Sequence, residues 1–149
     1  MIYAKETIFI PKYHGGSHFI GTVKKEELLK DRFVPVHERT ELFPNVFIFP
    51  VIPIKYKDDT HFERFKIKQD DELIADNFSD ELFIEIQHKN QINILSACSH
   101  RGITNICEMA SGYFNLPVNL ITGGFHMKDC SQEQLLHVSE YFNHLQPVT

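Results

Sequence analysis

The sequence predicts an α/β fold, and the stretch that carries the prediction spans residues 92–127. Its apolar residues lead into a loop at His100, and from Ile103 they recur at the three- and four-residue spacing of an amphipathic helix. Pro117 ends the helical pattern, and a β-branched run from Val118 stops at two glycines. Strand, helix and strand in this order form a β-α-β unit, whose two strands are parallel and joined by a right-handed crossover.

The same unit brings two histidines to one edge of the predicted sheet. His100 follows the first strand and His126 follows the second, so both lie beyond the carboxyl ends of parallel strands. Open α/β sheets bind ligands at this edge. Two imidazoles can hold a metal there, or they can close the loops by hydrogen bonding.

Length and composition narrow the class of protein. With 149 residues, 42% hydrophobic and 23% charged, the chain is expected to form a single domain over residues 1–149, with no need for disulfides. Its net charge of −5 argues against nucleic-acid binding. Three cysteines without a recognisable signal peptide, and no long apolar run, predict a cytoplasmic protein that does not associate with membranes.

The first third of the chain is expected to hold short elements. A strand at residues 2–4 and a helical turn at 7–10 precede a glycine-rich loop at 13–21. Thr22 is expected to cap a helix over 23–30, and proline makes 33–36 an edge strand.

The predicted glycine-rich loop contains His14 and His18, four residues apart. Two glycines lie between them, so a continuous helix that presents both imidazoles on one face is not expected. The loop is therefore interpreted as mobile or substrate-facing, and ordinary loop histidines are the alternative.

The rest of the chain builds up to the β-α-β unit and follows it. Residues 46–49 form an apolar run typical of a buried strand, and 54–80 is a polar stretch interpreted as solvent-exposed, with short strands near 62–67 and 73–75. A hairpin is expected from 82–86 to 92–97. Ser131 and Gln134 are spaced as in a capping box, and the helix after them is expected to bury Leu135, Val138, Phe142 and Leu145.

Two motifs resemble the metallo-β-lactamase-fold hydrolases, in the branch that is dihydropterin-ribofuranosylaminobenzene-phosphate synthase-like. That branch carries Gly-Cys-Ser-His-x-Gly-Ile-x-Asn and, one strand later, Gly-Gly-Phe-His-Leu. Here Ala97 replaces the first glycine and Met127 replaces the final leucine. The matching positions are Cys98, Ser99, His100, Gly102, Ile103 and Asn105, followed by Gly123, Gly124, Phe125 and His126.

The resemblance implies the second half of an αββα sandwich, a mixed sheet with helices on one face. It also implies a site in which two metal ions activate a water molecule, which then hydrolyses a phosphorylated or pterin-like small molecule. His100 would bind one ion, and His126 would lie at or beside the other. Zinc is the expected metal, with iron or manganese as alternatives.

The sequence also departs from this family. The His-x-His-x-Asp-His signature, which supplies most of the metal ligands, is absent, as is the late Pro-x-His-Cys-Thr-Gly segment. Catalytic zinc generally has three protein ligands, and the two motifs supply two. Asp129, Cys98, His14 and His18 are candidates for a third ligand, although nothing in their spacing requires it.

Two functional interpretations follow. In the first, the chain is part of a hydrolase whose site is completed by a companion chain or by self-association. In the second, it is an inactive remnant or a binding module. A half-sandwich should expose an apolar sheet face, so a homo-oligomer or a complex with a companion chain is expected.

By resemblance, the remaining candidate residues would support the metal ligands or bind substrate, and each has a structural alternative. Cys98 is most simply a small buried hydrophobe, and Ser99 a loop-forming residue. Gly123 and Gly124 either cradle a phosphate or allow two backbones to approach closely. An acidic turn that resembles one in the same branch contains Asp80 and Glu81. These two residues are interpreted as part of the hairpin or as groups that support the metal ligands.

Overall fold

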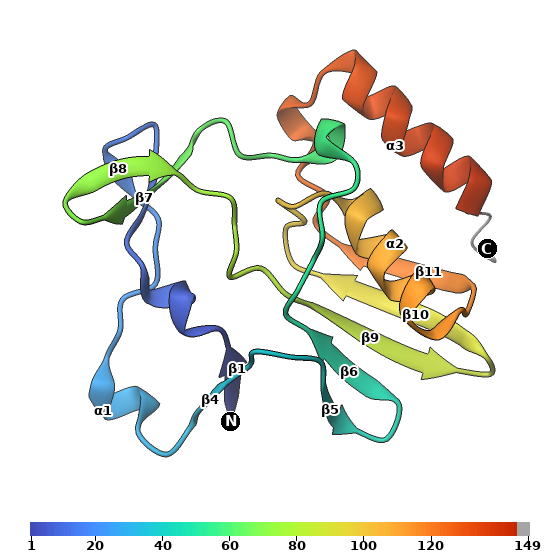
Figure 1. Cartoon of the computed structure of the whole chain (residues 1–149), viewed down its shortest axis with the longest axis horizontal. Helices are drawn as coiled ribbons and strands as arrows, with labels where there is room; N and C mark the ends of the chain where they lie inside the picture. Colours follow the sequence, from blue (N-terminus) through green and yellow to red (C-terminus); the bar gives the residue numbers. More distant parts are fainter. Residues whose placement is uncertain (146–149) are drawn as a thin grey trace.

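The main sheet of the protein has five strands. The structure is a computed structural model that describes residues 1–145. In the order β11-β10-β9-β6-β5, the strands are Val118–Gly123, Gln91–Ser96, Phe83–His88, Val46–Phe49 and Thr40–Phe43. Strands β10 and β11 are parallel and the other neighbours are antiparallel, so the sheet is mixed (Figure 1). The predicted β-α-β unit and hairpin are confirmed.

Two helices pack with this sheet around one apolar core. Helix α2 (Ile103–Phe114) lies against β10, and helix α3 (Gln132–Leu145) lies alongside α2 (Figure 1). The core draws on both helices and on every strand but β5, and its side chains include Phe47, Phe49, Phe83, Ile92, Ile94, Ile103, Ile106, Cys107, Val118 and Val138. Burial of these side chains is the main favourable term for this part of the fold.

Helix α3 begins as the sequence predicts. Ser131 Oγ accepts a hydrogen bond from Gln134 N at 3.1 Å, which satisfies one of the free N–H groups of the first turn. Val138 is buried and Phe142 packs against the core. The predicted burial of Leu135 is wrong, because its side chain is 51% exposed.

The two faces of the main sheet differ. Opposite residues in neighbouring strands share a face, so the pairing of Phe47 with Glu85 and of Glu85 with Ile94 defines the face that α2 covers. On the other face, Ile84 and Ile86 are only partly buried. We call this second side the open face; it supports the predicted arrangement with helices on one face of a half-sandwich.

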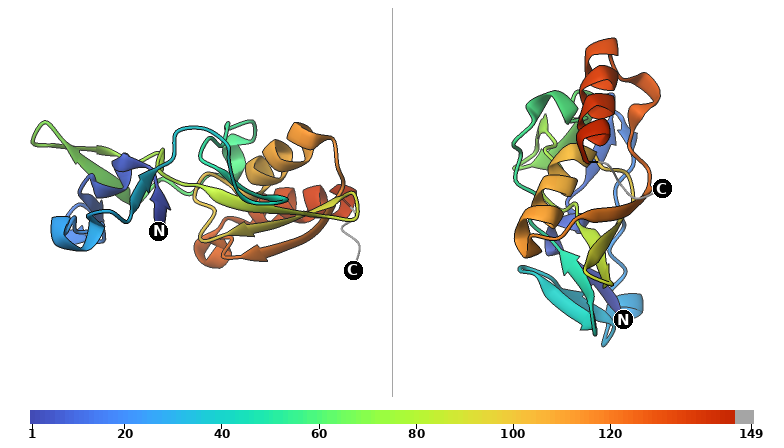
Figure 2. Two further views of the ribbon diagram at one scale, coloured as in Figure 1. Left: turned by 90° about the horizontal axis from the view of Figure 1, so that it is seen from below. Right: turned by 90° about the vertical axis from the view of Figure 1, so that its right-hand side faces the viewer.

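The peripheral elements form two small sheets. Strands β1 (Ile2–Ala4) and β4 (Phe33–Pro35) form a parallel pair, and β3 (His18–Phe19), β2 (Lys12–His14), β7 (Phe65–Gln69) and β8 (Glu72–Ala75) form a four-stranded sheet in that order. Short helices complete this part of the fold: η1 (Glu6–Phe9), α1 (Glu26–Leu29), η2 (Lys57–Asp59) and η3 (Met127–Asp129). Figure 2 shows the small sheets at the opposite end of an elongated molecule from the main sheet. Within residues 1–145, no helix is both long and apolar enough to cross a membrane.

Three sequence predictions in this region are wrong. The expected loop at 13–21 contains a β-hairpin, in which His14 pairs with His18 and Gly15 and Gly16 adopt positive φ at the turn. The helix expected at 23–30 is limited to α1, which follows Lys25 without a side-chain cap. The stretch 54–80 is not simply solvent-exposed, because Asp59 is 0% exposed.

Glu85 is a fully buried carboxyl group on the covered face of the sheet. Gln87 Nε2 donates to its Oε1 at 3.1 Å, whereas Oε2 has no partner within residues 1–145. Burial raises the pKa of Glu85 above its ordinary value.

This raised pKa makes stability depend on pH. A carboxyl whose pKa is higher in the folded state binds its proton more tightly there, so the free energy of unfolding falls as pH rises from the unfolded pKa through the folded one. We expect Glu85→Gln to be more stable than the wild type at neutral pH and to show a weaker decline with pH. Urea unfolding at about pH 5 and about pH 8 measures this; a steeper decline in the variant would contradict it.

Candidate functional site

The two motif histidines meet at the edge of the main sheet. The loop after β10 carries His100 and the loop after β11 carries His126, and the centroids of the two rings lie 4.3 Å apart. Because β10 and β11 are parallel, their carboxyl ends fall at the same edge. The spatial pairing expected from the sequence is therefore present, and a ligand role for the two imidazoles stays a prediction.

Two glycines allow the histidine loops to approach each other. Gly123 has a φ of +135°, and a Cβ at this position would lie 1.6 Å from the carbonyl oxygen of Ser96. A Cβ on Gly124 would lie 2.6 Å from the carbonyl oxygen of Ala97. Ser99 Oγ links the loops by donating to Gly124 O at 2.8 Å. Close backbone packing thus accounts for both glycines and for the loop-forming role of Ser99.

The acidic turn between β8 and β9 supports His100 from two sides. Glu81 accepts hydrogen bonds from the backbone N–H groups of His100 and Arg101, each at 2.7 Å. The Phe78 ring stacks on the His100 ring with centroids 3.8 Å apart and an interplanar angle of 8°. Glu81 therefore acts on the backbone of this loop, and Phe78 acts on the ring.

The same turn is tied to the four-stranded sheet by a cation. Lys12 Nζ, on β2, lies 2.5 Å from Asp76 Oδ2 and 2.9 Å from Asp80 Oδ1. It also lies 4.8 Å from the centroid of the Phe78 ring. The role of Asp80 is therefore to hold the turn against β2 through its ion pair with Lys12.

A third histidine, which the sequence did not single out, joins the pair. The His61 ring lies 5.1 Å from the His126 ring between centroids, and its side chain is 7% exposed. Its Nε2 faces Asp59 Oδ1 at 3.7 Å, and its Nδ1 lies 3.4 Å from Gln134 Nε2. The sequence feature that could have indicated His61 is the spacing of two residues between the Asp59 carboxylate and the His61 imidazole. This feature lies in a stretch that was expected to be solvent-exposed.

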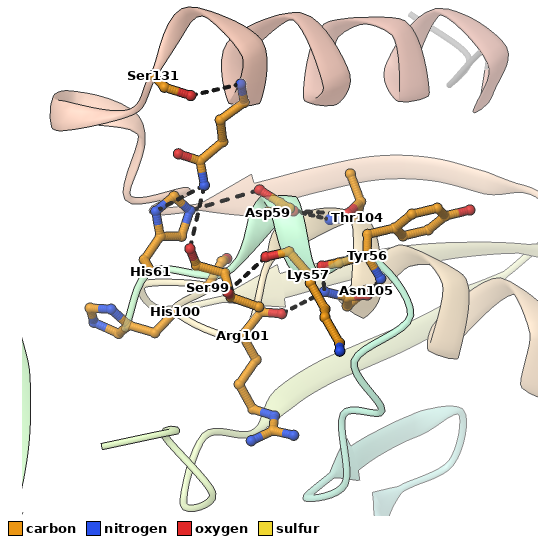
Figure 3. Close-up of polar contacts among 12 residues, drawn as sticks. Tyr56, Lys57, Asp59, His61, Ser99, His100, Arg101, Thr104, Asn105 and Ser131 are labelled. Carbon is orange, nitrogen blue, oxygen red and sulfur yellow. Dashed lines mark hydrogen bonds and ion pairs between the residues drawn. The ribbon is translucent and has the colours of Figure 1, made fainter. Parts of the chain in front are cut away.

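Asp59 links this histidine to the start of α2. Its Oδ2 accepts hydrogen bonds from Thr104 N at 2.8 Å and Thr104 Oγ1 at 2.9 Å, so it satisfies a free N–H of the first helical turn. Figure 3 shows Asp59 between His61 and Thr104. A carboxylate at a helix N-terminus is favoured by the helix dipole.

The other motif residues make structural contacts. Asn105 Oδ1 accepts hydrogen bonds from the backbone N–H groups of Lys55 and Tyr56, at 2.8 and 2.7 Å. Figure 3 shows Asn105 beside Tyr56. Gly102 has a φ of +96°, and a Cβ there would lie 2.7 Å from the Asp59 carbonyl oxygen. Phe125 packs against the core. These contacts fix the loop of residues 55–61 beside α2.

The remaining histidine and cysteine candidates are dispersed. His14 lies on the wall of the cleft described below, whereas its hairpin partner His18 is not among the residues that line it. Cys98 is exposed, so the expectation that it is a buried hydrophobe is wrong. Cys107 is in the core, with 0% exposure.

A cleft of about 690 Å³ opens beside the histidines, between the four-stranded sheet and the start of α3. Its wall combines imidazoles, carboxylates and cations: His14, His61, His126, Asp58, Glu63, Asp129, Lys57 and Arg64. Phe62 and Phe65 add aromatic surface. Asp129, one of the candidates for a third metal ligand, forms an ion pair with Arg64 at 3.7 Å. The positive charge of Arg64 therefore offsets part of the negative charge of Asp129.

Burial keeps the central imidazoles neutral. Desolvation, followed by the charge of His126, lowers the pKa of His100 to about 4. Desolvation, followed by the charge of His61, also lowers the pKa of His126. Neutral imidazole is the form that binds metal ions.

The donor types suit a metal, but their number falls short. His100 Nδ1 and His61 Nε2 are buried and have no hydrogen-bond partner in the part of the chain that the structure describes. In that same part, no group of three or more His, Cys, Asp or Glu side chains is arranged to hold a metal ion. The described residues alone therefore do not form a complete catalytic metal site.

Comparisons with known proteins place this arrangement in a fold family. The chain matches no protein-family model. It superposes with a TM-score of 0.87 and 26% identity on the crystal structure of a metal-dependent hydrolase of the β-lactamase superfamily, over 97% of this chain and 56% of that one. The chain has a partial metallo-β-lactamase fold. The fold class expected from the two motifs is thereby confirmed.

The chain is also similar to two curated relatives, both from Methanocaldococcus jannaschii. One is an uncharacterised protein, 25% identical over 144 residues, which cover 95% of this chain and 53% of the relative. The other is 7,8-dihydropterin-6-methyl-4-(beta-D-ribofuranosyl)-aminobenzene-5'-phosphate synthase, 26% identical, with 91% of this chain and 50% of the relative covered. The chain spans about half the length of the curated relatives it matches.

Proposed function

We propose that this chain supplies part of the active site of a metal-dependent hydrolase of the metallo-β-lactamase superfamily. The observation that carries the proposal is the contact between the His100 and His126 rings, 4.3 Å apart between centroids, beyond the ends of two parallel strands. The structural neighbour, a metal-dependent hydrolase, supports it.

In this proposal the site is shared. His100 and His126 bind a divalent metal, zinc before iron or manganese, and His61 stands beside them with Asp59 facing its Nε2. Residues 1–145 of one copy hold no group of three suitable side chains, and the proposal takes the remaining ligands from a companion chain or from a second copy of this chain. We derive no catalytic step for the chain by itself.

The cleft favours a small molecule with a flat ring as substrate. Phe62 and Phe65 offer aromatic surface beside His14, and Arg64 and Lys57 are cations on the same wall. We propose a phosphorylated or pterin-like compound, in keeping with the name of one relative, a synthase of a dihydropterin phosphate. The carboxylates of the same wall mean that a phosphate would depend on further cations for charge balance.

Metal retention tests this proposal. The wild type and a His100→Ala, His126→Ala double variant are dialysed to equilibrium against dilute zinc, and bound metal is measured by inductively coupled plasma mass spectrometry. We expect weak retention by the wild type, below one zinc per chain at low micromolar zinc, because two or three imidazoles bind less tightly than a full site. The double variant should lose it.

The control removes two exposed histidines that lie away from the site. A His37→Ala, His88→Ala double variant lowers the histidine count equally and should retain metal like the wild type. Equal retention by all three proteins would contradict the proposal. The inactive remnant or binding module would then be the better interpretation.

A further inference from the structure

The open face of the main sheet is apolar across all five strands. The strand register places Phe43, Val46, Ile84, Ile86, Leu95 and Leu120 on it. Leu120 is 52% exposed, Phe43 is 69% exposed, and Ile84 and Ile86 are partly covered. Ile48, which pairs with Ile84 on the same face, is buried at 3% exposure, so the exposed apolar surface is not continuous over β6. An exposed apolar surface of this kind marks an interaction site in a soluble protein.

The open face of the five strands carries no carboxylate, lysine or arginine. The two charged residues of the five strands, Glu41 and Glu85, both belong to the covered face, because they pair with Phe47. The polar members of the open face include Asn93, Thr122 and, at the end of β9, the exposed His88. Two copies of a chain with a net charge of −5 could therefore meet at this surface without placing like charges opposite one another.

We propose that the open face is the interface of a symmetric homodimer, in which two copies pack sheet against sheet. Sheets that pack face to face bury their facing side chains and leave their helices outside. One copy provides a single sheet with helices on one side, and two copies provide two sheets between outer helices.

This inference goes beyond the proposed metal site and does not depend on it. The open face is made by the strands themselves, whereas the histidines lie in the loops beyond two of them. In a two-fold dimer each substituted residue occurs twice in the interface, so a single substitution has a doubled effect.

The oligomeric state of the full chain tests the inference. In sedimentation equilibrium at micromolar concentration, we expect the wild type at about twice its chain mass of 17.4 kDa. Leu120→Lys places two ammonium groups in the interface and should weaken the dimer by about tenfold or more. The matched control is Leu136→Lys on α3, because Leu136 is 58% exposed and outside the open face; it should remain dimeric.

Two outcomes would overturn the inference. One is a wild type that sediments as a monomer, which would assign the open face to a different occupant, such as a companion chain. The other is a dimer that Leu120→Lys and Leu136→Lys affect equally. Far-ultraviolet circular dichroism of both variants establishes that the substitutions leave the fold intact.

Discussion

Replacing Gly123 by alanine is expected to destabilise the protein by about 4 kcal/mol or more, or to prevent folding. The new Cβ would lie 1.6 Å from the carbonyl oxygen of Ser96, where backbone must move to admit it. The φ of +135° is in addition a conformation that side-chain-bearing residues rarely adopt. Separation of β10 from β11 would pull the two histidine loops apart, so the site would be lost with the fold.

Urea unfolding followed by circular dichroism measures this effect, with Gly112→Ala as the control. Gly112 lies within α2, and a Cβ there would meet no atom within 4 Å. Alanine is the better helix former, so this control should be more stable than the wild type by about 0.5–1 kcal/mol. Similar losses in the two variants would show that the close approach of the loops does not limit stability.

The parts of the fold that the sequence predicted depend on local patterns. The helical spacing after Ile103 and the β-branched run from Val118 indicate their elements within a few residues of each position. Once these elements are known, the rule for parallel strands brings His100 and His126 together without further information. The pairing was therefore predictable from a single stretch of chain.

The third histidine could not be found in this way. His61 reaches the site because Asn105 holds the backbone of residues 55–56 and Asp59 caps α2, contacts that span more than 40 positions of the sequence. No periodicity marks such a contact, and the polar composition of the segment favoured a solvent-exposed interpretation. The same reasoning accounts for Cys98, whose exposure depends on how two loops pack.

The hairpin around His14 was missed for a different reason. Glycines at 15 and 16 were interpreted as evidence against regular structure, whereas their positive φ values form the tight turn between two very short strands. The hairpin is then stabilised because β2 also pairs with β7, which lies far along the chain: His14 pairs with Phe65. Short strands of this kind owe their stability to partners that the sequence does not identify.

Lys12→Met is expected to destabilise the protein by about 3–5 kcal/mol, because it leaves a buried carboxylate without its cation. The Lys12 side chain is 11% exposed and that of Asp76 is 2% exposed, with Nζ and Oδ2 2.5 Å apart. Methionine keeps the length and apolar stem of lysine, so the change isolates the charge. Urea unfolding of the wild type and the variant gives the difference.

The control for this prediction is Lys68→Met, which removes an ion pair on the surface of the same four-stranded sheet. Lys68 Nζ lies 2.8 Å from Asp71 Oδ1, but the two side chains are 44% and 92% exposed. Solvent screens such a pair, so the loss of stability should be much smaller than that caused by Lys12→Met. An equal loss of unfolding free energy in the two variants would contradict the prediction. It would mean that the buried Lys12–Asp76 ion pair contributes no more to stability than the exposed Lys68–Asp71 pair.

The same pair of variants tests whether the four-stranded sheet positions the site. Lys12 orders the turn that carries Phe78, and the Phe78 ring stacks on His100 with centroids 3.8 Å apart. A ring stacked in this way shifts the proton resonances of its neighbour, so Lys12→Met should move the His100 ring signals in NMR spectra under conditions where the protein remains folded. Lys68→Met should leave them in place. Unchanged His100 signals in both variants would limit Lys12 to a role in stability.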